Sequence, residues 1–201
     1  MNSKNKIPQK FYLSDDVINT SKLLLGKILV TNINNKITSG MITEVEAYLG
    51  INDKASHTYN NKRTSRTEPM FSKGGIVYIY LCYGIHHLIN IVVGKRDFPS
   101  AILIRSIKPV DGIKTMMERR NFKKLTKELT NGPGKLTKAL GITMKYNSIS
   151  LNSKKIWIEN HNIIINKKDI LSSSRIGVDY AGEDAKLPYR FYIKNNKWIS
   201  K

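Results

Sequence analysis

Two glutamates, Glu44 and Glu46, lie two residues apart in the stretch TEVEAYLGINDKASH, and their spacing is the first feature that points to chemistry. Because side chains alternate along a strand, both carboxylates would share one face of the β-type run that contains them. Such a pair can bind a hard metal ion, raise the pKa of one partner by repulsion, or supply a general base beside a stabilising anion. A solvated strand edge has the same spacing, so this alternative stays open.

Aromatic side chains gather near these carboxylates in the sequence. Tyr48 and His57 follow them, and the later stretch VYIYLCYGIHHLIN places Tyr78 and Tyr80 on one strand face and Tyr83 at a turn. Tyrosines at this spacing are usually part of a sheet, but a tyrosine on a tight turn can project outward from a rigid support. Together these rings are suited to a pocket for a flat aromatic ligand, such as a base of a nucleic acid.

The overall charge favours a polyanionic partner. Lys and Arg number 34 against 15 Asp and Glu, which gives a formal net charge of +19. Such an excess attracts phosphate through the release of counterions. AT-rich codon usage would also enrich the chain in Lys, Asn and Ile, so the charge favours nucleic acid without establishing it.

Length and cysteine content limit the class of protein. The 201 residues contain no repeat and no Pro/Gly/Ser-rich linker, so we expect one domain over residues 1–201, with a flexible segment at 1–10. The single cysteine, Cys82, excludes a disulfide framework and a multi-cysteine zinc site, and is expected to be a small buried side chain. The apolar runs are far shorter than the ~20 residues of a membrane span, and no signal-peptide pattern begins the sequence, so we expect a cytoplasmic protein without a membrane partner.

In the first half of the chain, the sequence predicts a helix, a β-hairpin and a long loop. Ser14 resembles an N-cap with an acidic first turn, and Gly26 a C-cap, which predicts a helix between them. Residues 27–31 and 36–46 flank Asn34-Asn35 and predict a hairpin. The polar, basic segment 58–75 reads as a long surface loop of the kind that is often functional.

The second half of the chain continues the sheet. β-rich runs at 76–82, 88–93 and 100–107 predict a meander. Helices are expected at 111–121 and from Pro133 to a C-cap at Gly141, followed by strands at 156–159 and 190–193. We therefore predict an α+β fold, a single domain with a mostly antiparallel, curved β-sheet and flanking helices.

Several stretches, taken in order, carry a family resemblance: EVEAYLG, His57, KRTSR with MF, VYIYLCYGIHHLIN, AILIRSIKP, NGPGKLTKALGI, and RIGVDYAGE with PYRFYI. The pattern resembles the alkyladenine (3-methyladenine) DNA glycosylase family, of the mammalian type, from about Phe11 to Ile199. Ile85 departs from the family, which commonly has methionine after YG. RTSRTEPMF likewise stands where RTPRN usually precedes MF.

The resemblance implies a monofunctional DNA repair enzyme, a monomer associated with the nucleoid. It would flip an alkylated or deaminated purine out of double-stranded DNA, hydrolyse the N-glycosidic bond and leave an abasic site, with no metal and no cofactor. Glu46 matches the general base that activates water, and Arg105 matches an active-site arginine near the backbone of the flipped nucleotide. A carboxylate suits this reaction because the sugar develops positive charge as the bond breaks.

The resemblance also implies roles for recognition residues. Tyr48, His57 and Tyr80 match the walls of the base pocket, and Asn90 matches the residue that disfavours the amino group of normal guanine. Tyr83 matches the side chain that intercalates into the gap left by the flipped nucleotide.

The basic residues near these motifs are candidates for contacts with the DNA backbone. Arg63, Arg66 and Lys73 lie in the long polar loop, where solvated charges are the usual alternative. Gly134 and Lys135 begin a predicted helix, so that free backbone N–H groups and an ammonium could meet a phosphate, although GPGK is also an ordinary helix entry.

Two other functions remain open from the residues alone. A metal-dependent nuclease could use Glu44, Glu46, Asp53 and His57, because carboxylates and an imidazole can hold a divalent ion. A nonenzymatic protein could instead stack its tyrosines on single-stranded bases while lysines follow the backbone. Activity in the presence of a chelator would exclude the first alternative, and formation of an abasic product would exclude the second.

Overall fold

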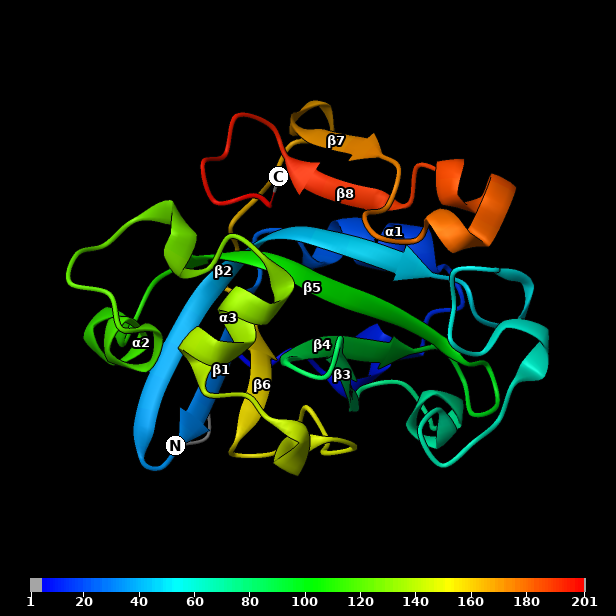
Figure 1. Cartoon of the computed structure of the whole chain (residues 1–201), viewed down its shortest axis with the longest axis horizontal. Coiled ribbons are helices and arrows are strands. Elements are labelled where there is room, and N and C mark those ends of the chain that lie inside the picture. Colours follow the sequence, from blue (N-terminus) through cyan, green and yellow to red (C-terminus); the bar gives the residue numbers. More distant parts are fainter. Residues whose placement is uncertain (1–4, 201) are drawn as a thin grey trace.

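The strands form one antiparallel sheet around a long central strand, β2 (Lys36–Tyr48). The computed structural model describes residues 5–200. β2 pairs first with β1 (Ile28–Ile33) and then with β5 (Ser100–Pro109). The remaining strands of the described chain are β3 (Val77–Cys82), β4 (His86–Val93), β6 (Ile156–Glu159), β7 (Ile170–Ser173) and β8 (Arg190–Ile193). Their order is β3-β4-β5-β2-β1-β6, with β8 pairing with the end of β2 and β7 with β8 (Figure 1).

A bulge bends the sheet where β2 meets β5. Ile42 pairs with Ile107 and Val45 pairs with Ile104, and the register shifts twice between these pairs. A bulge re-aims the side chains that follow it and increases the local twist. The result is a curved sheet in which Ile42 and Val45 both face the main core, although an uninterrupted strand would place them on opposite faces.

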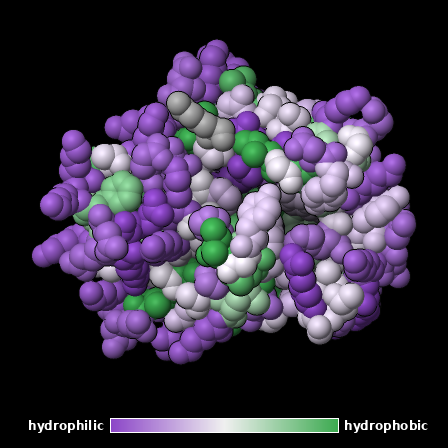
Figure 2. All heavy atoms as spheres, viewed as in Figure 1, coloured by the Kyte–Doolittle hydropathy of each residue, from purple (hydrophilic) through white to green (hydrophobic). Residues whose placement is uncertain are grey.

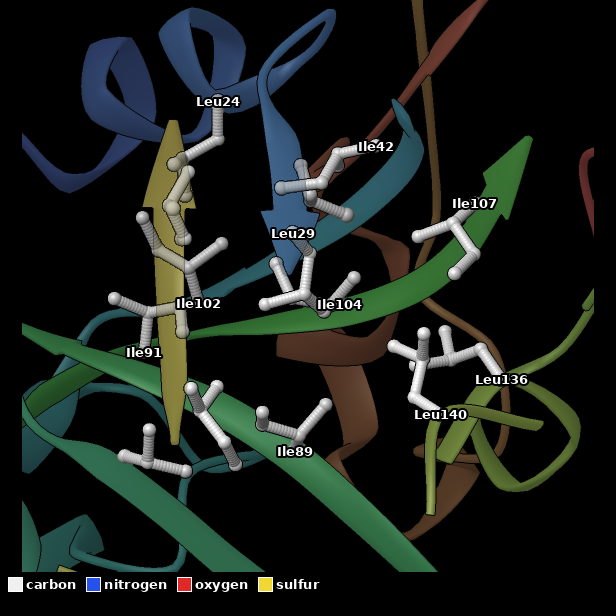
Figure 3. Packing of buried hydrophobic residues seen from close by; sticks show 14 of the residues in the cluster. Leu24, Leu29, Ile42, Ile89, Ile91, Ile102, Ile104, Ile107, Leu136 and Leu140 are labelled. Carbon is white, nitrogen blue, oxygen red and sulfur yellow. The ribbon is translucent and has the colours of Figure 1, made fainter. Parts of the chain in front are cut away.

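The main hydrophobic core lies on one face of this sheet. Two helices pack there, α1 (Val17–Leu24) and α3 (Pro133–Leu140). Figure 3 shows Leu24 from α1 and Leu136 and Leu140 from α3 among the isoleucines of the strands. Full burial of such a side chain contributes roughly 1.5–3 kcal/mol to folding. Because this face is closed by apolar contacts, the opposite face is the one available for a polar site.

The start of α1 differs from the sequence prediction. Its N-cap is Asp16, whose carboxylate accepts a hydrogen bond from the backbone N–H of Asn19 at 2.9 Å, so Ser14 is not the cap. Ser14 lies two residues earlier, where its hydroxyl accepts from the N–H of Asp16 at 3.2 Å. The Ser-Asp-Asp run offers several capping side chains, and the sequence does not show which one the chain will use. At the other end, Gly26 follows the helix with φ +83°.

The other predicted helices are confirmed. α2 (Ile113–Arg120) is bounded by Gly112 and Asn121, both in the left-handed conformation, and buries Met116. α3 has Pro133 at its first turn and ends at Gly141 with φ +75°. Proline suits a first turn because its missing N–H would have no partner there.

The predicted hairpin and meander are also confirmed, with two additions. β7 was not predicted, because its residues lie at the edge of the sheet and show no clear alternation of buried and exposed side chains. The polar segment 58–75 contains two short 3-10 helices, Tyr59–Asn61 and Glu68–Phe71, the second of which buries Pro69, Met70 and Phe71. This loop is therefore anchored to the molecule at its second half.

We expected residues 1–10 to be flexible, and the described part of that segment is held by the sheet. The backbone N–H of Ile7 donates to the carbonyl of Ile158 at 2.9 Å, and the backbones of Lys6 and Glu159 form an isolated antiparallel β-bridge. Residues 1–4 lie outside the described part of the chain. Within residues 5–200, no helix is long and apolar enough to cross a membrane.

Candidate active site

The end of β2 carries a buried carboxylate, that of Glu46, which has partners on both of its oxygens. Glu46 has no solvent exposure, and its Oε2 accepts hydrogen bonds from the Tyr48 hydroxyl at 2.9 Å and from Nη1 of Arg105 at 3.1 Å. Its Oε1 accepts from the backbone N–H of Ile176 at 2.8 Å. Three donors from separate parts of the chain therefore hold one carboxylate in a defined orientation.

A cavity of about 490 Å³ lies against the groups that hold this carboxylate, and Glu46 itself is not one of its lining residues. Tyr48 and Arg105, which both bond to Glu46, contribute to its lining, and so do Ile176 and Gly177. The cavity is formed by the sheet face opposite the main core together with the β3–β4 turn and the start of α3. Its other lining residues include Ser56, His57, Tyr78, Tyr80, Tyr83, His86, Asn90 and Tyr180.

One wall of the cavity is built from aromatic rings that pack against one another. The ring of His57 meets that of Tyr80 edge to face, with centroids 4.7 Å apart, and its Nδ1 is 2.9 Å from the hydroxyl of Tyr78. The guanidinium of Arg66 lies 5.3 Å from the centroid of the Tyr80 ring and 3.4 Å from Nε2 of His57. Aromatic surfaces of this kind can stack on a planar base.

The wall is electrostatically tuned. Burial, together with the nearby charges of Arg66 and Lys62, lowers the pKa of His57 to about 4. Burial and the charge of Glu46 raise the pKa of Tyr48 well above its ordinary value. The imidazole is therefore neutral and the phenol protonated near pH 7, so that Tyr48 donates to Glu46.

The floor of the cavity has a fixed positive charge beside a polar amide. Burial would lower the pKa of Arg105, but the carboxylates of Glu46 and Glu44 outweigh it and raise the pKa. Asn90 is 4% exposed, and its Nδ2 donates to the carbonyl of Tyr78 at 3.2 Å. The bond turns the Asn90 amide into a fixed part of the cavity floor.

The turn between β3 and β4 projects two large side chains into solvent. Tyr83 is 86% exposed with φ +50°, and Ile85 is 71% exposed. Gly84 between them also has positive φ, at +72°, so the turn is tight. Figure 2 shows apolar and weakly polar side chains gathered over β3 and β4 in the middle of a largely hydrophilic face. Tyr83 also borders the cavity.

The basic residues divide into bonded and exposed groups. Arg63 bonds to Glu68 at 2.6 Å and to Asp97 at 3.0 Å, so its guanidinium stabilises the loop. Lys135 pairs with Glu128, whereas the side chain of Lys73 is exposed.

Gly134 lies against the ring of His86, and a Cβ there would come within 2.9 Å of it. The structure thus places Gly134 and Lys135 at the cavity, with Arg66 behind the Tyr80 ring and Arg63 and Lys73 outside the lining.

Several organising residues had no role in the sequence prediction. Arg175 is buried, bonds to both oxygens of Asp53 at 2.5 and 2.8 Å, and lies 4.9 Å from the centroid of the Tyr48 ring. Arg190 and Ser200 bond to Glu44. Arg175 and Arg190 lie in the quoted segments RIGVDYAGE and PYRFYI, which could have drawn attention to them, whereas no signal distinguished Ser200.

In the structure, the four residues of the nuclease alternative bond to other side chains, and two of them, Glu44 and Glu46, share Arg105. Asp53 bonds to Arg175, Glu44 bonds to Arg105 and Arg190, and His57 bonds to Tyr78. Among residues 5–200, no group of three or more His, Cys, Asp or Glu side chains is arranged to hold a metal ion.

Cys82, expected to be buried, is only partly covered and borders the cavity.

Comparison with known proteins gives consistent matches over nearly the whole chain. Residues 10–197 match the family model described as methylpurine-DNA glycosylase. A protein of Chlamydia abortus is 48% identical over 192 residues, which cover 94% of this chain and all of the relative. A protein of Clostridium perfringens (strain SM101) is 42% identical over 204 residues, covering 98% of this chain and 99% of the relative. Both bear the provisional name 3-methyladenine DNA glycosylase. These relatives are bacterial, so the mammalian type that we expected is not supported.

Proposed function

This chain belongs to the methylpurine-DNA glycosylase family, and on that premise we propose that it flips damaged purines out of double-stranded DNA into the cavity above Glu46. It is a DNA glycosylase, a hydrolase of N-glycosyl bonds that acts in DNA repair. The proposed substrates are 3-methyladenine and related alkylated or deaminated purines, and the proposed product is an abasic site. We further propose that residues 1–201 act as one catalytic domain, as a monomer on cytoplasmic, nucleoid DNA.

The observation that carries the mechanism is the Glu46 carboxylate, held from both sides beneath an aromatic cavity. As the glycosidic bond breaks, positive charge develops on the sugar, and a nearby anion lowers the energy of that state. The same carboxylate can accept a proton from the attacking water. Arg105 and Tyr48 orient Glu46 at 3.1 and 2.9 Å, so little reorganisation is needed when the charge forms.

The cavity wall accounts for recognition of the base. Tyr48, Tyr80 and the neutral His57 present rings on which a flipped purine can stack, and a damaged purine with a positive charge gains further from these aromatic faces. Extrusion costs a few kcal/mol of unstacking, which these contacts offset in part. In this proposal the fixed amide of Asn90 occupies the space that the amino group of guanine would need.

The exposed turn accounts for the opening of the duplex. The Tyr83 ring is 86% exposed at the border of the cavity, so it is placed to enter the gap that a flipped nucleotide leaves. The net charge of +19 attracts the phosphate backbone. Arg63, Arg66, Lys73, Gly134 and Lys135 remain the candidates for backbone contacts in this proposal.

The test is direct detection of products. The protein is incubated, with EDTA present, on duplexes that each carry one hypoxanthine, one 7-methylguanine or one ethenoadenine, and on methylated genomic DNA for release of 3-methyladenine. We expect free base by chromatography and strand breaks only after alkaline treatment. Strand breaks without alkali, or loss of activity with EDTA, would instead favour the nuclease. Binding to single strands with no free base would favour the nonenzymatic alternative.

A further inference from the structure

Beneath the proposed catalytic carboxylate lies a second one, Glu44, that is saturated with hydrogen bonds. Its Oε1 accepts from Nε of Arg105 at 3.1 Å, from Nε of Arg190 at 2.6 Å and from the Ser200 hydroxyl at 2.6 Å. Its Oε2 accepts from the Ser106 hydroxyl at 2.9 Å and from the backbone N–H of Ser200 at 2.5 Å. These bonds leave the Glu44 carboxylate with no free acceptor site, so it cannot itself activate water.

Ser200 connects this carboxylate to the arginine above it. Its Oγ lies 3.3 Å from Nε and 3.2 Å from Nη2 of Arg105 while it donates its single proton to Glu44. One donor and two acceptor positions exhaust the hydrogen-bonding capacity of a hydroxyl. The backbone carbonyl of Ser200 also accepts from Nη2 of Arg190 at 3.0 Å. Every polar atom of Ser200 described here therefore serves the same charge network.

The geometry points to a role for Ser200 in catalysis, and we propose that Ser200, with Glu44, is a positioning residue that fixes the direction in which Arg105 presents Nη1 to Glu46. A guanidinium is planar, so holding Nε and Nη2 sets the direction of Nη1. That atom is the one that contacts Glu46, at 3.1 Å. The inference rests on the proposed function, in which the orientation of Glu46 determines the rate of hydrolysis.

Ser106 provides a matched comparison within the same network. Its hydroxyl also donates to Glu44 and is also buried, and within residues 5–200 it forms no hydrogen bond with the side chain of its chain neighbour Arg105. Removing either hydroxyl leaves Glu44 short of one donor. Only the removal at Ser200 takes a partner from the Arg105 guanidinium: Nη2 loses its hydroxyl acceptor, and Nε keeps Glu44 alone. The two variants therefore separate a positioning role from general support of a buried carboxylate.

The experiment compares Ser200→Ala, Ser200→Thr and Ser106→Ala with the wild type in single-turnover excision of hypoxanthine from a duplex, well below the melting temperature of each variant. We expect Ser200→Ala to lower the rate constant about tenfold, because small misplacements of catalytic groups have effects of this order or larger. Affinity for the lesion duplex should change less than twofold. Ser106→Ala should keep the rate within about twofold, and Ser200→Thr, which keeps the hydroxyl, should regain most of it.

A second readout follows Arg105 directly and does not depend on activity. In ¹H–¹⁵N spectra at low temperature, the Nη2–H signals of Arg105 should be protected from exchange in the wild type and in Ser106→Ala, and lose protection in Ser200→Ala, because Ser200 is the acceptor for Nη2 whereas Nε keeps its bond to Glu44. An unchanged rate in folded Ser200→Ala, or equal losses in Ser106→Ala and Ser200→Ala, would overturn the inference. If Ser200→Ala does not fold, Ser200→Cys, which keeps the size of the side chain but is a weaker donor and acceptor, is measured in its place by the same criteria. Absence of excision by the wild type would count against the proposed function, whereas the protection of Arg105 would still test the inference.

Discussion

Two regions bordering the same cavity differ completely in how they are built. Beneath it, Glu44, Glu46 and Arg105 lie within a buried network in which each charge has several partners. At its edge, the β3–β4 turn exposes 86% of Tyr83 and 71% of Ile85, and neither side chain belongs to the core. In the buried network, many hydrogen-bond donors hold two carboxylates. In the turn, the side chains of Tyr83 and Ile85 are exposed to solvent.

The difference follows from the two tasks in the proposed function. Stabilising charge in a transition state requires dipoles and ions that are already oriented, which burial between strands provides. Entering a DNA duplex requires a side chain that reaches beyond the surface, which a tight turn provides. We therefore expect changes in the buried network to alter the chemical step, and changes in the turn to alter only the handling of duplex DNA.

The largest expected effect is at the buried network. Glu46→Gln should lower the single-turnover rate of base excision by about a thousandfold or more, because the amide neither accepts a proton from water nor offsets the charge on the sugar. Binding to a lesion duplex should change little, since the amide keeps the shape of the side chain. Chromatography of released base and a fluorescence-anisotropy titration measure the two quantities.

Glu44→Gln is the matched control for this variant. Its carboxylate has no free acceptor site, so the substitution should reduce activity far less than Glu46→Gln while lowering the melting temperature, because a buried charge network loses its centre. Equal losses of activity in the two variants would contradict the assignment of a single base and would return weight to a paired-carboxylate mechanism.

The next effect belongs to the turn. Tyr83→Ala should lower excision from duplex DNA by about tenfold, because an intercalating ring offsets only part of an unstacking cost of a few kcal/mol. Excision from a single strand that carries the same lesion should be nearly unchanged, since a single strand has no gap to fill. Excision rates of the wild type and of Tyr83→Ala on both substrates, at two salt concentrations, give the comparison.

Ile85→Ala tests whether the ring itself is responsible. Ile85 is on the same turn and is almost as exposed, so this variant removes apolar surface while Tyr83 remains. We expect a smaller loss on duplex DNA than for Tyr83→Ala. If Tyr83→Ala lost equal activity on single and double strands, Tyr83 would be a stacking residue of the pocket, and the division between the two regions would fail.

A smaller effect is expected between the two regions, at Asn90. Asn90→Ser should raise excision of guanine-type bases relative to adenine-type bases by a few fold, because it removes a fixed amide from the floor of the cavity. The ratio of rates on 7-methylguanine and hypoxanthine duplexes measures this. An unchanged ratio would remove Asn90 from base selection.

The smallest effect concerns pH and His57. Its pKa of about 4 in the folded protein is below the ordinary histidine value of 6.5, so the unfolded chain binds the proton first as pH falls. His57 therefore contributes stability above pH 6.5 that is lost on acidification toward pH 4, by at most about 3 kcal/mol. His57→Gln should flatten the dependence of unfolding free energy on pH in this window. A midpoint near 6.5 for the His57 ring signals in NMR would contradict the prediction.

Local patterns were sufficient for most of the secondary structure. Turn residues and periodicity predicted the hairpin at Asn34-Asn35, the meander and the helix that begins at Pro133, because these signals act over a few residues. Local patterns failed where neighbouring residues compete to cap a helix, and where a strand depends on its partner strand. The N-cap of α1 is Asp16 and not the predicted Ser14, and β7 depends on its pairing with β8.

Two glutamates in alternation, tyrosines on a strand and on a turn, and a large excess of positive charge are all visible in the order of residues along the chain. The role of each glutamate is set by folding. Both face the same side of the sheet, yet contacts from residues more than 100 positions away saturate Glu44 through Ser200 and orient Glu46 through Ile176. Spacing along a strand fixes the face on which a carboxylate lies, whereas its hydrogen-bond partners and its access to a cavity depend on distant segments that meet only in the folded chain.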